Sequence, residues 1–404
     1  MSKVLYTDKF DQLMQYLIIA LGFFMPLSVA LGNILMVMIV ALFVFSGGLS
    51  LNNFVKIRNN KIILVGLLFY LSHVIGMLWT ENTEWGLVIL KKMIDFLVFL
   101  PILWLVTKRE NAIFYISAFL LAIFITANYS LFISLEILDP FNNGNVNDPT
   151  PFMSRISHGP FLAFAFYLQT KLLFDNDNKK IVNIFLIISL VITFYSIFAS
   201  GGRMGYVAFF LAVFVIFFQK YKINLKTILI PLLINVALIY LLIIFSSVFA
   251  NRIEEAKSNI QIFFADKNVS TSIGLRAAFI YHTSDLIFNN PFFGVGTGDF
   301  PDEYKKINEK SDYKTWNIHQ PHNMHLLILA QNGLFGYTFF LLLFTTLIRQ
   351  ALKNQEKIFR DLGLFLPILF FTISFSDSYL LGHFTTFLFI YFSSFIYKFN
   401  FERK

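Results

Sequence analysis

The stretch that sets this chain apart is a glycine-punctuated segment from Ser270 to Gly336. It contains Ile273-Gly274-Leu275-Arg276 and then Asn290-Pro291-Phe292-Phe293-Gly294-Val295-Gly296-Thr297-Gly298-Asp299-Phe300. It continues to His322-Asn323 and, after nine further residues, reaches Gly333-Leu334-Phe335-Gly336. Nearly all of the remaining sequence consists of apolar runs. We therefore expect this segment and its neighbours to carry the residues that do chemistry.

The rest of the chain has the composition of an integral membrane protein. Of the 404 residues, 57% are hydrophobic and only 14% are charged, and the mean hydropathy is +0.67. Soluble domains carry about 25% charged residues. The chain has no cysteine, which excludes disulfides, thiolate metal sites and a cysteine nucleophile. We predict an all-α, polytopic membrane protein.

Twelve apolar runs are candidates for transmembrane helices, because about 20 residues cross a hydrocarbon core of roughly 30 Å. They are predicted at residues 13–31, 33–50, 62–79, 88–106, 112–136, 158–174, 181–199, 205–219, 227–249, 323–348, 359–376 and 379–397. The chain then divides into helices one to nine within residues 1–249, a large and partly helical loop over residues 250–321, and helices ten to twelve within residues 322–404.

The orientation of these helices explains the net charge of +8 better than a nucleic-acid partner does. If the N-terminus is cytoplasmic, the predicted cytoplasmic segments hold 20 of the 32 Lys and Arg residues, and the short external segments hold only Arg155 and Arg203. We predict that both termini are inside and that the loop over residues 250–321 is outside. A loop of that length is usually functional.

Two arginines are candidates for binding an anion. Arg203 follows Ser200-Gly201-Gly202 in a short external turn, where the glycines alone satisfy the turn. Its forked guanidinium suits phosphate oxygens, and the alternative is an arginine that snorkels to the membrane interface. Arg276 opens an amphipathic helix predicted at about residues 274–288, where the alternative is a solvated surface residue.

A histidine at the start of the tenth predicted span is the candidate general base. The imidazole of His322 can accept a proton from a hydroxyl at neutral pH, and Asn323 can orient it or a substrate. His319 and His325 lie close in sequence, so the identity of the base stays open. A metal site is the alternative for this triple, although no carboxylate completes a ligand set.

Other polar positions give weaker signals. The run from Gly294 to Gly298 offers backbone N–H groups to a phosphate, but its spacing is not that of a dinucleotide fingerprint. The polar segment at residues 139–157 ends in Arg155 and is followed by His158. Lys91 and Lys92, in or beside the fourth span, indicate either an interfacial helix or an anion-binding role.

Together these motifs resemble one family. His-Asn, nine residues and Gly-x-x-Gly is similar to the pattern that ends the large periplasmic loop of the O-antigen ligase and polymerase superfamily. Residues 290–300 resemble the loop signature that follows that superfamily's Gly-x-Arg helix. Ser200-Gly201-Gly202-Arg203 resembles its Ser-x-x-Arg-like segment. The resemblance covers the whole chain.

The resemblance implies a glycosyltransferase on the periplasmic face of a bacterial inner membrane, which takes its glycan from an undecaprenyl-diphosphate carrier without a metal or another cofactor. It implies that Arg203 and Arg276 bind the diphosphate and stabilise it as it leaves, and that His322 activates the acceptor hydroxyl. Further predicted substrate contacts are Asn323, His319, Gly294, Gly296, Asp299, His158 and Arg155.

Within the superfamily, the length of the chain favours an O-antigen ligase, with lipid A–core oligosaccharide as the acceptor. The alternative is an O-antigen polymerase, which uses the same donor and a second lipid-linked glycan. A twelve-span lipid-glycan transporter is less favoured, because the two halves of the chain look unrelated and intramembrane acids are scarce. The expected partners are the donor, the acceptor and membrane lipids, with no nucleic acid.

Overall fold

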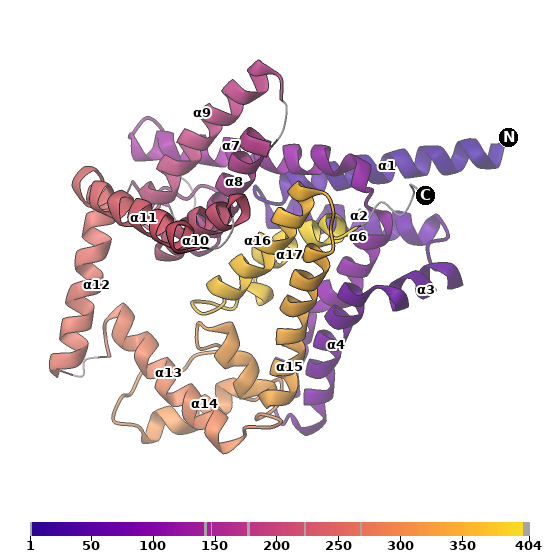
Figure 1. The fold of residues 1–404 in the computed structure, drawn as a ribbon. Coiled ribbons are helices and arrows are strands. Elements are labelled where there is room, and N and C mark those ends of the chain that lie inside the picture. Colours follow the sequence, from indigo (N-terminus) through magenta and orange to yellow (C-terminus); the bar gives the residue numbers. More distant parts are fainter. Residues whose placement is uncertain are drawn as a thin grey trace.

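The computed structural model describes residues 2–140, 144–146, 148–175, 178–221, 224–266 and 269–398. This part of the chain is all helical and contains no strand (Figure 1). The α-helices are α1 (Ser2–Phe24), α2 (Val29–Phe45), α3 (Leu51–Asn59), α4 (Lys61–Gly76), α5 (Thr83–Lys92), α6 (Leu100–Val106), α7 (Ala112–Ser134), α8 (Arg155–Asp175), α9 (Lys180–Ala199), α10 (Arg203–Lys220), α11 (Leu225–Phe245), α12 (Ser247–Asp266), α13 (Ser272–Asn289), α14 (Phe300–Lys310), α15 (Met324–Leu352), α16 (Lys357–Ile373) and α17 (His383–Ile396). Short helical turns are η1 (Met77–Trp79), η2 (Asp95–Phe99), η3 (Arg109–Asn111) and η4 (Tyr379–Leu381).

Six helical segments among the described residues are long and apolar enough to cross a membrane. They are Lys61–Trp79, Arg109–Ser134, Lys180–Ala199, Arg203–Lys220, Leu225–Phe245 and Met324–Leu352. The shorter helices α2 and α17 are also apolar. The prediction of an all-α membrane protein is therefore confirmed. Each predicted span overlaps a helix, but the count of twelve, the side of the membrane and the placing of the large loop stay predictions; residues 399–404 lie outside the described residues.

The fourth predicted span, residues 88–106, is not the single helix that its apolar run indicates. α5 ends at Lys92, η2 is π-helical, and α6 carries Pro101 in its first turn. Proline has no N–H group and fits a helix only near its start, and a π-helical turn absorbs the resulting irregularity. α5 is thus a separate amphipathic helix, with Lys92 Nζ lying 5.7 Å from the centre of the Trp85 ring.

The centre of the bundle is α17, in which every residue from Thr385 to Ile396 is buried. The helices α6, α8 and α16 pack around it and enclose its side chains. α11 is the opposite case. Its buried residues are only Thr227, Pro231, Asn235 and Leu242, so it presents most of its apolar surface outward, as a lipid-facing helix does.

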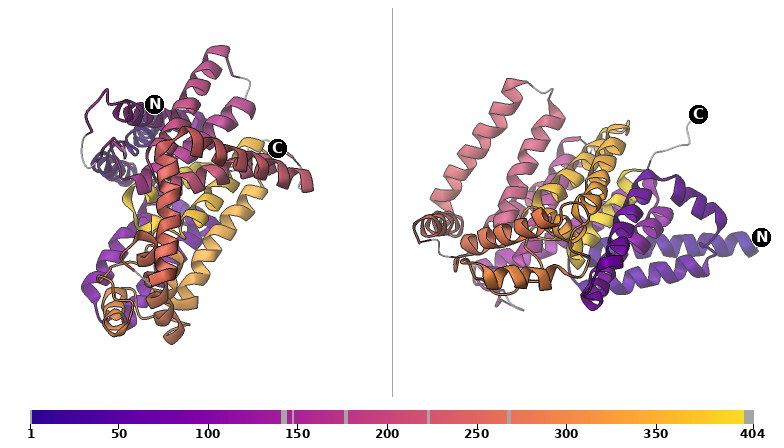
Figure 2. Two further views of the ribbon diagram at one scale, coloured as in Figure 1. Left: turned by 90° about the vertical axis from the view of Figure 1, so that its left-hand side faces the viewer. Right: turned by 90° about the horizontal axis from the view of Figure 1, so that it is seen from below.

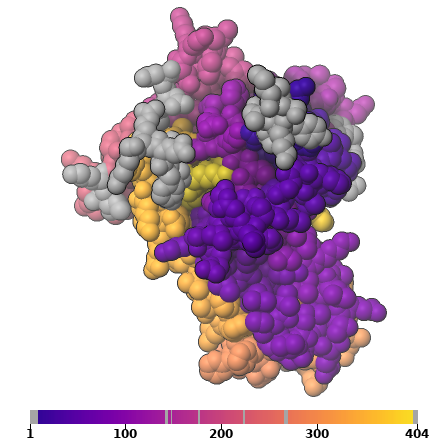
Figure 3. Space-filling model, turned by 90° about the vertical axis from the view of Figure 1, so that its right-hand side faces the viewer, coloured from indigo at the N-terminus to yellow at the C-terminus, as the bar shows by residue number. Residues whose placement is uncertain are grey.

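α4 and α15 lie side by side and join the two ends of the molecule (Figures 1, 2 and 3). The last turn of α4 and the first turns of α15 lie beside α13 and α14, and we call this the loop end. The start of α4 and the last turn of α15 form the opposite end. α15 consists of two helical segments that meet at Gly333, where the backbone is not helical. The amphipathic helix predicted at residues 274–288 is confirmed as α13.

Candidate active site

A cavity of about 300 Å³ opens at the loop end, where segments distant in sequence meet. We call it the arginine cavity. It is lined by Arg155 and Ile156 of α8, Gly201 to Met204 at the start of α10, Arg252, Glu255 and Asn259 of α12, Ser272 and Arg276 of α13, and Ser376, Asp377 and Tyr379 after α16. Four guanidinium groups face two carboxylates, so the lining has an excess of positive charge and suits an anion.

Glycines place Arg203 at this cavity. Gly201 has a φ of +64°, which an L-residue adopts only under strain. A side chain at Gly205 would lie 2.8 Å from the Cα atom of Gly159, so α8 and α10 approach each other here. Arg203 is the first residue of α10, and its Nη2 atom lies 3.6 Å from Oε2 of Glu255. The turn therefore fixes where the guanidinium enters the cavity.

Arg276 reaches the cavity from α13. The helix begins at an N-cap, in which the side chain of Thr271 accepts a hydrogen bond from Gly274 N at 3.1 Å. Arg276 is exposed, lines the cavity and has no carboxylate partner among the described residues. Its guanidinium is therefore available to an anionic ligand.

Another face of α13 is anchored by a buried hydrogen bond. Nδ1 of His282 lies 3.0 Å from the Tyr304 hydroxyl of α14. Burial lowers the pKa of His282, and Asp285 opposes this shift only in part. The imidazole is consequently neutral at neutral pH and bonds to Tyr304 without placing a charge in the core. This contact holds α13, and with it Arg276, against α14.

His322 joins the arginine cavity through Asp377. Its Nδ1 atom lies 3.5 Å from Oδ1 of Asp377, which itself lines the cavity. Asp377 also accepts hydrogen bonds from Ser378 N at 2.7 Å and from Gln320 Nε2 at 3.4 Å. His322 has a φ of +50°, a conformation that costs a non-glycine residue about 1–3 kcal/mol and recurs at active sites.

Asp377 escaped the sequence analysis, as did Arg252 and Glu255. The signal that could have revealed Asp377 is its place as an acidic residue in the short turn between two predicted apolar spans. Charge is rare at such a place and needs a partner. That partner, His322, is distant in sequence, so only the fold reveals the pair.

The neighbouring histidines have other surroundings. His325 is buried, with Nδ1 lying 3.0 Å from the Tyr337 hydroxyl and Nε2 lying 3.1 Å from the Phe371 carbonyl oxygen. His319 stacks on Trp85 with ring centres 4.5 Å apart, and it does not line the arginine cavity. No group of three metal-ligating side chains occurs in the described part of the chain. Of the three histidines, His322 alone contacts a residue of the cavity lining.

His158 and Arg155 are neighbours in sequence, yet only one of them lines the cavity. The ring of His158 is buried inside the bundle, and neither of its nitrogens has a hydrogen-bond partner among the described residues. Arg155 lines the cavity and lies 3.6 Å from a carboxylate oxygen of Asp148. Arg155 is therefore the better placed of the two to contact a substrate.

The glycine-rich run from Gly294 to Gly298 packs against other parts of the chain, contrary to the expectation that its N–H groups bind a phosphate. Gly294 N donates to the Asn290 carbonyl at 3.1 Å and Gly296 N to the Gln331 carbonyl at 2.9 Å, so neither N–H group is free for a phosphate. Asp299 accepts from the backbone N–H groups of Glu81 and Asn82 at 3.0 and 2.7 Å. None of the three predicted substrate contacts lines the arginine cavity.

The run docks into a break in α15. Gly333 has a φ of +59°, and a side chain there would lie 2.3 Å from the Phe292 carbonyl carbon. The absence of a side chain at Gly333 thus lets the backbone of the loop approach α15 closely. Asn323 caps α15 by accepting from Leu326 N at 3.1 Å, so its oxygen is already engaged.

One family model matches the part of the chain that contains Arg203, Arg276 and His322. Residues 188–341 match the family model described as O-antigen ligase. This match supports membership of the chain in the O-antigen ligase superfamily. The matched region runs from within α9 into α15 and includes Arg203, Arg276 and His322. No curated protein matches the chain. Membership implies a membrane-bound, glycosyl-transferring enzyme of the O-antigen ligase or polymerase type, with a lipid-linked glycan as donor and a lipid as acceptor.

Proposed function

We propose that this protein is an O-antigen ligase. It transfers a glycan from undecaprenyl diphosphate to lipid A–core oligosaccharide on the periplasmic face of the bacterial inner membrane. The observation that carries the proposal is the meeting of Arg203, Arg276 and the His322–Asp377 pair around one cavity of about 300 Å³. The family match supports a glycosyl-transferring enzyme of the O-antigen ligase or polymerase type, and the length of the chain favours the ligase.

In this proposal the donor diphosphate occupies the arginine cavity. Arg276 has no carboxylate partner among the described residues, and Arg203 shares Glu255 with Arg252, whose Nη1 lies 2.8 Å from that carboxylate. Guanidinium groups form paired, charge-assisted hydrogen bonds with phosphate oxygens. Held in place before the reaction, they stabilise the charge that develops as the diphosphate leaves. This mechanism uses no metal ion.

The proposed reaction is a single displacement at the anomeric carbon. His322 accepts the proton of the acceptor hydroxyl at Nε2, while Nδ1–H points to Asp377, which orients the ring and stabilises its positive charge. The acceptor oxygen forms a new bond to the anomeric carbon, and the bond from that carbon to the diphosphate oxygen breaks. The electron pair of the broken bond leaves with undecaprenyl diphosphate, between Arg203 and Arg276.

Two of the remaining residues keep a proposed substrate role on the strength of their position. Arg155 lines the arginine cavity. Asn323 directly follows His322 in the sequence and caps the start of α15. Either residue can contact the glycan or the acceptor. His319 is exposed beside α5, at the outer edge of the loop end.

Deletion of the gene in its native host, followed by analysis of surface glycan and lipid-linked glycan, tests the proposal. Loss of a ligase leaves full-length polymer on undecaprenyl diphosphate and lipid A–core without glycan. Loss of a polymerase instead leaves lipid A–core with a single repeat unit. Unchanged surface glycan, with no build-up of carrier-linked polymer, would contradict both activities.

A further inference from the structure

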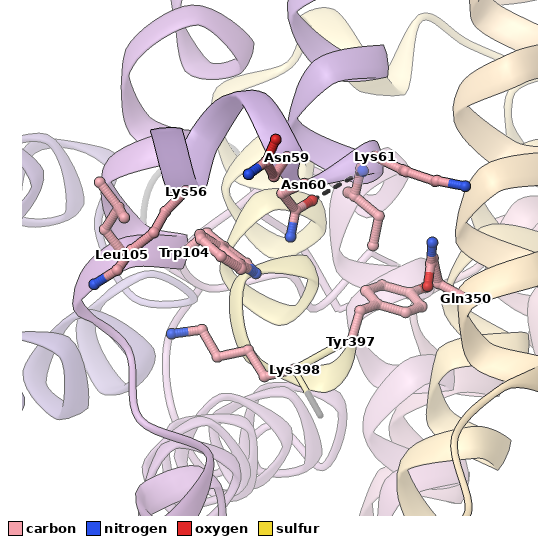
Figure 4. A pocket seen from close by; sticks show the side chains of 10 residues that line it. Lys56, Asn59, Asn60, Lys61, Trp104, Leu105, Gln350, Tyr397 and Lys398 are labelled. Atoms are coloured by element: carbon pink, nitrogen blue, oxygen red, sulfur yellow. Dashed lines mark hydrogen bonds between the residues drawn. The ribbon is translucent and has the colours of Figure 1, made fainter. Parts of the chain in front are cut away.

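A second polar cavity lies at the opposite end of the molecule, far from the arginine cavity. Its volume is about 450 Å³. It is lined by Lys56 and Asn59 of α3, Asn60 to Ile62 at the start of α4, Trp104 and Leu105 of α6, Gln350 near the end of α15, and Tyr397 and Lys398 after α17 (Figure 4). We call it the lysine cavity.

The lysine cavity has positive charge without compensation. Lys56, Lys61 and Lys398 line it, no carboxylate does, and none of the three has a carboxylate partner among the described residues. Other cations at this end do have such partners. Lys108 contacts Asp11, Arg109 Nη2 lies 3.1 Å from Glu356 Oε1, and Lys171 Nζ lies 2.6 Å from Asp361 Oδ2. The lysine cavity differs in that three lysines share one lining that contains no carboxylate.

Lys398 and Trp104 lie next to each other in the lining of this cavity. Lys398 Nζ lies 5.3 Å from the centre of the Trp104 ring and donates to the Thr107 carbonyl oxygen. Burial, with a smaller contribution from Lys56, lowers the pKa of Lys398 to about 8. The Trp104 indole N–H is buried and has no acceptor among the described residues. An anion bound between these groups would neutralise the lysines and accept a hydrogen bond from the indole N–H.

We propose that the lysine cavity binds the phosphate headgroup of an anionic phospholipid in the leaflet opposite the arginine cavity. Basic pockets between helices are the usual binding sites for anionic headgroups, and each lysine near a charged membrane surface adds to the attraction. Trp104 and Tyr397 are residue types that settle at the membrane interface. The side chains of Asn59 and Gln350 provide further donors to phosphate or glycerol oxygens.

A free phosphate ester has the same headgroup chemistry, and the acyl chains distinguish the two sources. Leu105 and Ile62 line the cavity beside the lysines, so a lipid can bury hydrocarbon at its margin whereas a soluble ester cannot. The site is independent of glycan transfer, because its residues lie at the other end of α4 and α15 from the proposed active site.

Binding to the purified full-length protein in neutral detergent tests this proposal. Phosphatidylglycerol, phosphatidylcholine and glycerol phosphate are titrated separately, and bound ligand is counted by native mass spectrometry. We expect saturable binding of phosphatidylglycerol at least tenfold tighter than that of either of the other two. Equal binding of phosphatidylcholine would overturn the charge argument, and equal binding of glycerol phosphate would overturn the lipid source.

Variants locate the site. Lys56→Gln combined with Lys398→Gln should weaken phosphatidylglycerol binding about tenfold or more, whereas Lys398→Arg should retain it. Lys226→Gln combined with Lys353→Gln removes the same charge from exposed positions outside the cavity and should change binding less than about twofold. Because Lys398 also bonds to Thr107, Lys56→Gln alone provides a variant at an exposed position, with a severalfold loss expected. Wild-type affinity in the double variant, or an equal loss in the exposed pair, would overturn the assignment.

Discussion

The arginine cavity and the lysine cavity are both positively charged, yet they are built differently. In the first, Arg203 is held by Glu255, Asp377 contacts His322, and His322 itself has a strained backbone. In the second, three lysines share no carboxylate and the indole N–H of Trp104 has no acceptor among the described residues. In the first cavity Arg203 and His322 have carboxylate partners before a ligand arrives, whereas in the second none of the three lysines has one among the described residues.

This difference matches the difference between catalysing a reaction and binding a ligand. A catalytic site gains from groups that are already oriented toward the charge that develops in the transition state. A headgroup site needs to attract a phosphate and to accept it in several orientations. Lysines suit this role, because each is a point charge on a flexible side chain. The following changes would break or sharpen the comparison, in order of decreasing effect.

Removing the imidazole should have the largest effect. His322→Ala removes the proposed base, and general base catalysis contributes about 10²–10⁴-fold to a rate. We expect transfer of a lipid-linked glycan by the purified protein to fall by that factor, while lipid binding at the lysine cavity is unchanged. His383→Ala, an exposed histidine at the start of α17, is the control and should keep wild-type transfer. Transfer within about threefold of wild type for His322→Ala would remove His322 from the mechanism.

Asp377 should matter through His322 rather than by itself. Asp377→Asn keeps the shape of the side chain but loses the charge that orients the ring, and misplacement of a catalytic group costs roughly 10²-fold. We expect kcat to fall with little change in the KM for the donor, and Asp377→Glu to restore part of the rate. A change in the KM alone, or no recovery with glutamate, would indicate a role in binding or folding.

These two residues also show what the sequence does and does not predict. Local motifs in the sequence point to Arg203, Arg276 and His322, and the apolar runs indicate most of the helices. Asp377 belongs to no motif, and its role depends on a contact made by the packing of α16 against α15. The glycine-rich run was assigned to phosphate because composition alone does not reveal that its N–H groups already bond to residues such as Gln331.

The lysine cavity was missed for a related reason. Its lysines come from α3, α4 and the chain after α17, and the positive-inside pattern explained each of them separately. The missing carboxylates become visible only when these segments are placed together. Likewise, the sequence does not show that the backbone of Phe292 lies against Gly333, where α15 is broken.

The break in α15 predicts a defined loss of stability. Gly333→Ala places a β-carbon in a left-handed conformation and against the Phe292 backbone, so we expect a loss of at least about 2 kcal/mol in the free energy of unfolding. Gly47→Ala is the matched control, because Gly47 has a φ of +78° with no atom near the added carbon. It should lose about 1 kcal/mol. Thermal unfolding in detergent measures the loss of stability in both variants. Equal losses would mean that the loop at Phe292 moves aside without a cost in free energy.

The smallest expected effect is a pH dependence at the lysine cavity. The pKa of Lys398 is lowered from 10.5 to about 8 in the folded protein. Between these values the unfolded chain binds the proton more strongly, so the free energy of unfolding should rise as the pH increases from 8 toward 10.5. Lys398→Gln should flatten this rise, as should bound phosphatidylglycerol. Unfolding followed across this range measures the slope, and an identical slope in the variant would exclude Lys398 as its source.

The most direct measurement of the central claim compares glycan transfer by purified Arg203→Ala, Arg276→Ala and the double variant, with a defined undecaprenyl-diphosphate-linked donor. If both guanidinium groups stabilise one leaving diphosphate, each single variant should lose about 10²–10³-fold in rate. The double variant should then be little worse than either single variant, because the groups act as a unit. Wild-type transfer by either single variant would show that the arginine cavity is not where the diphosphate leaves.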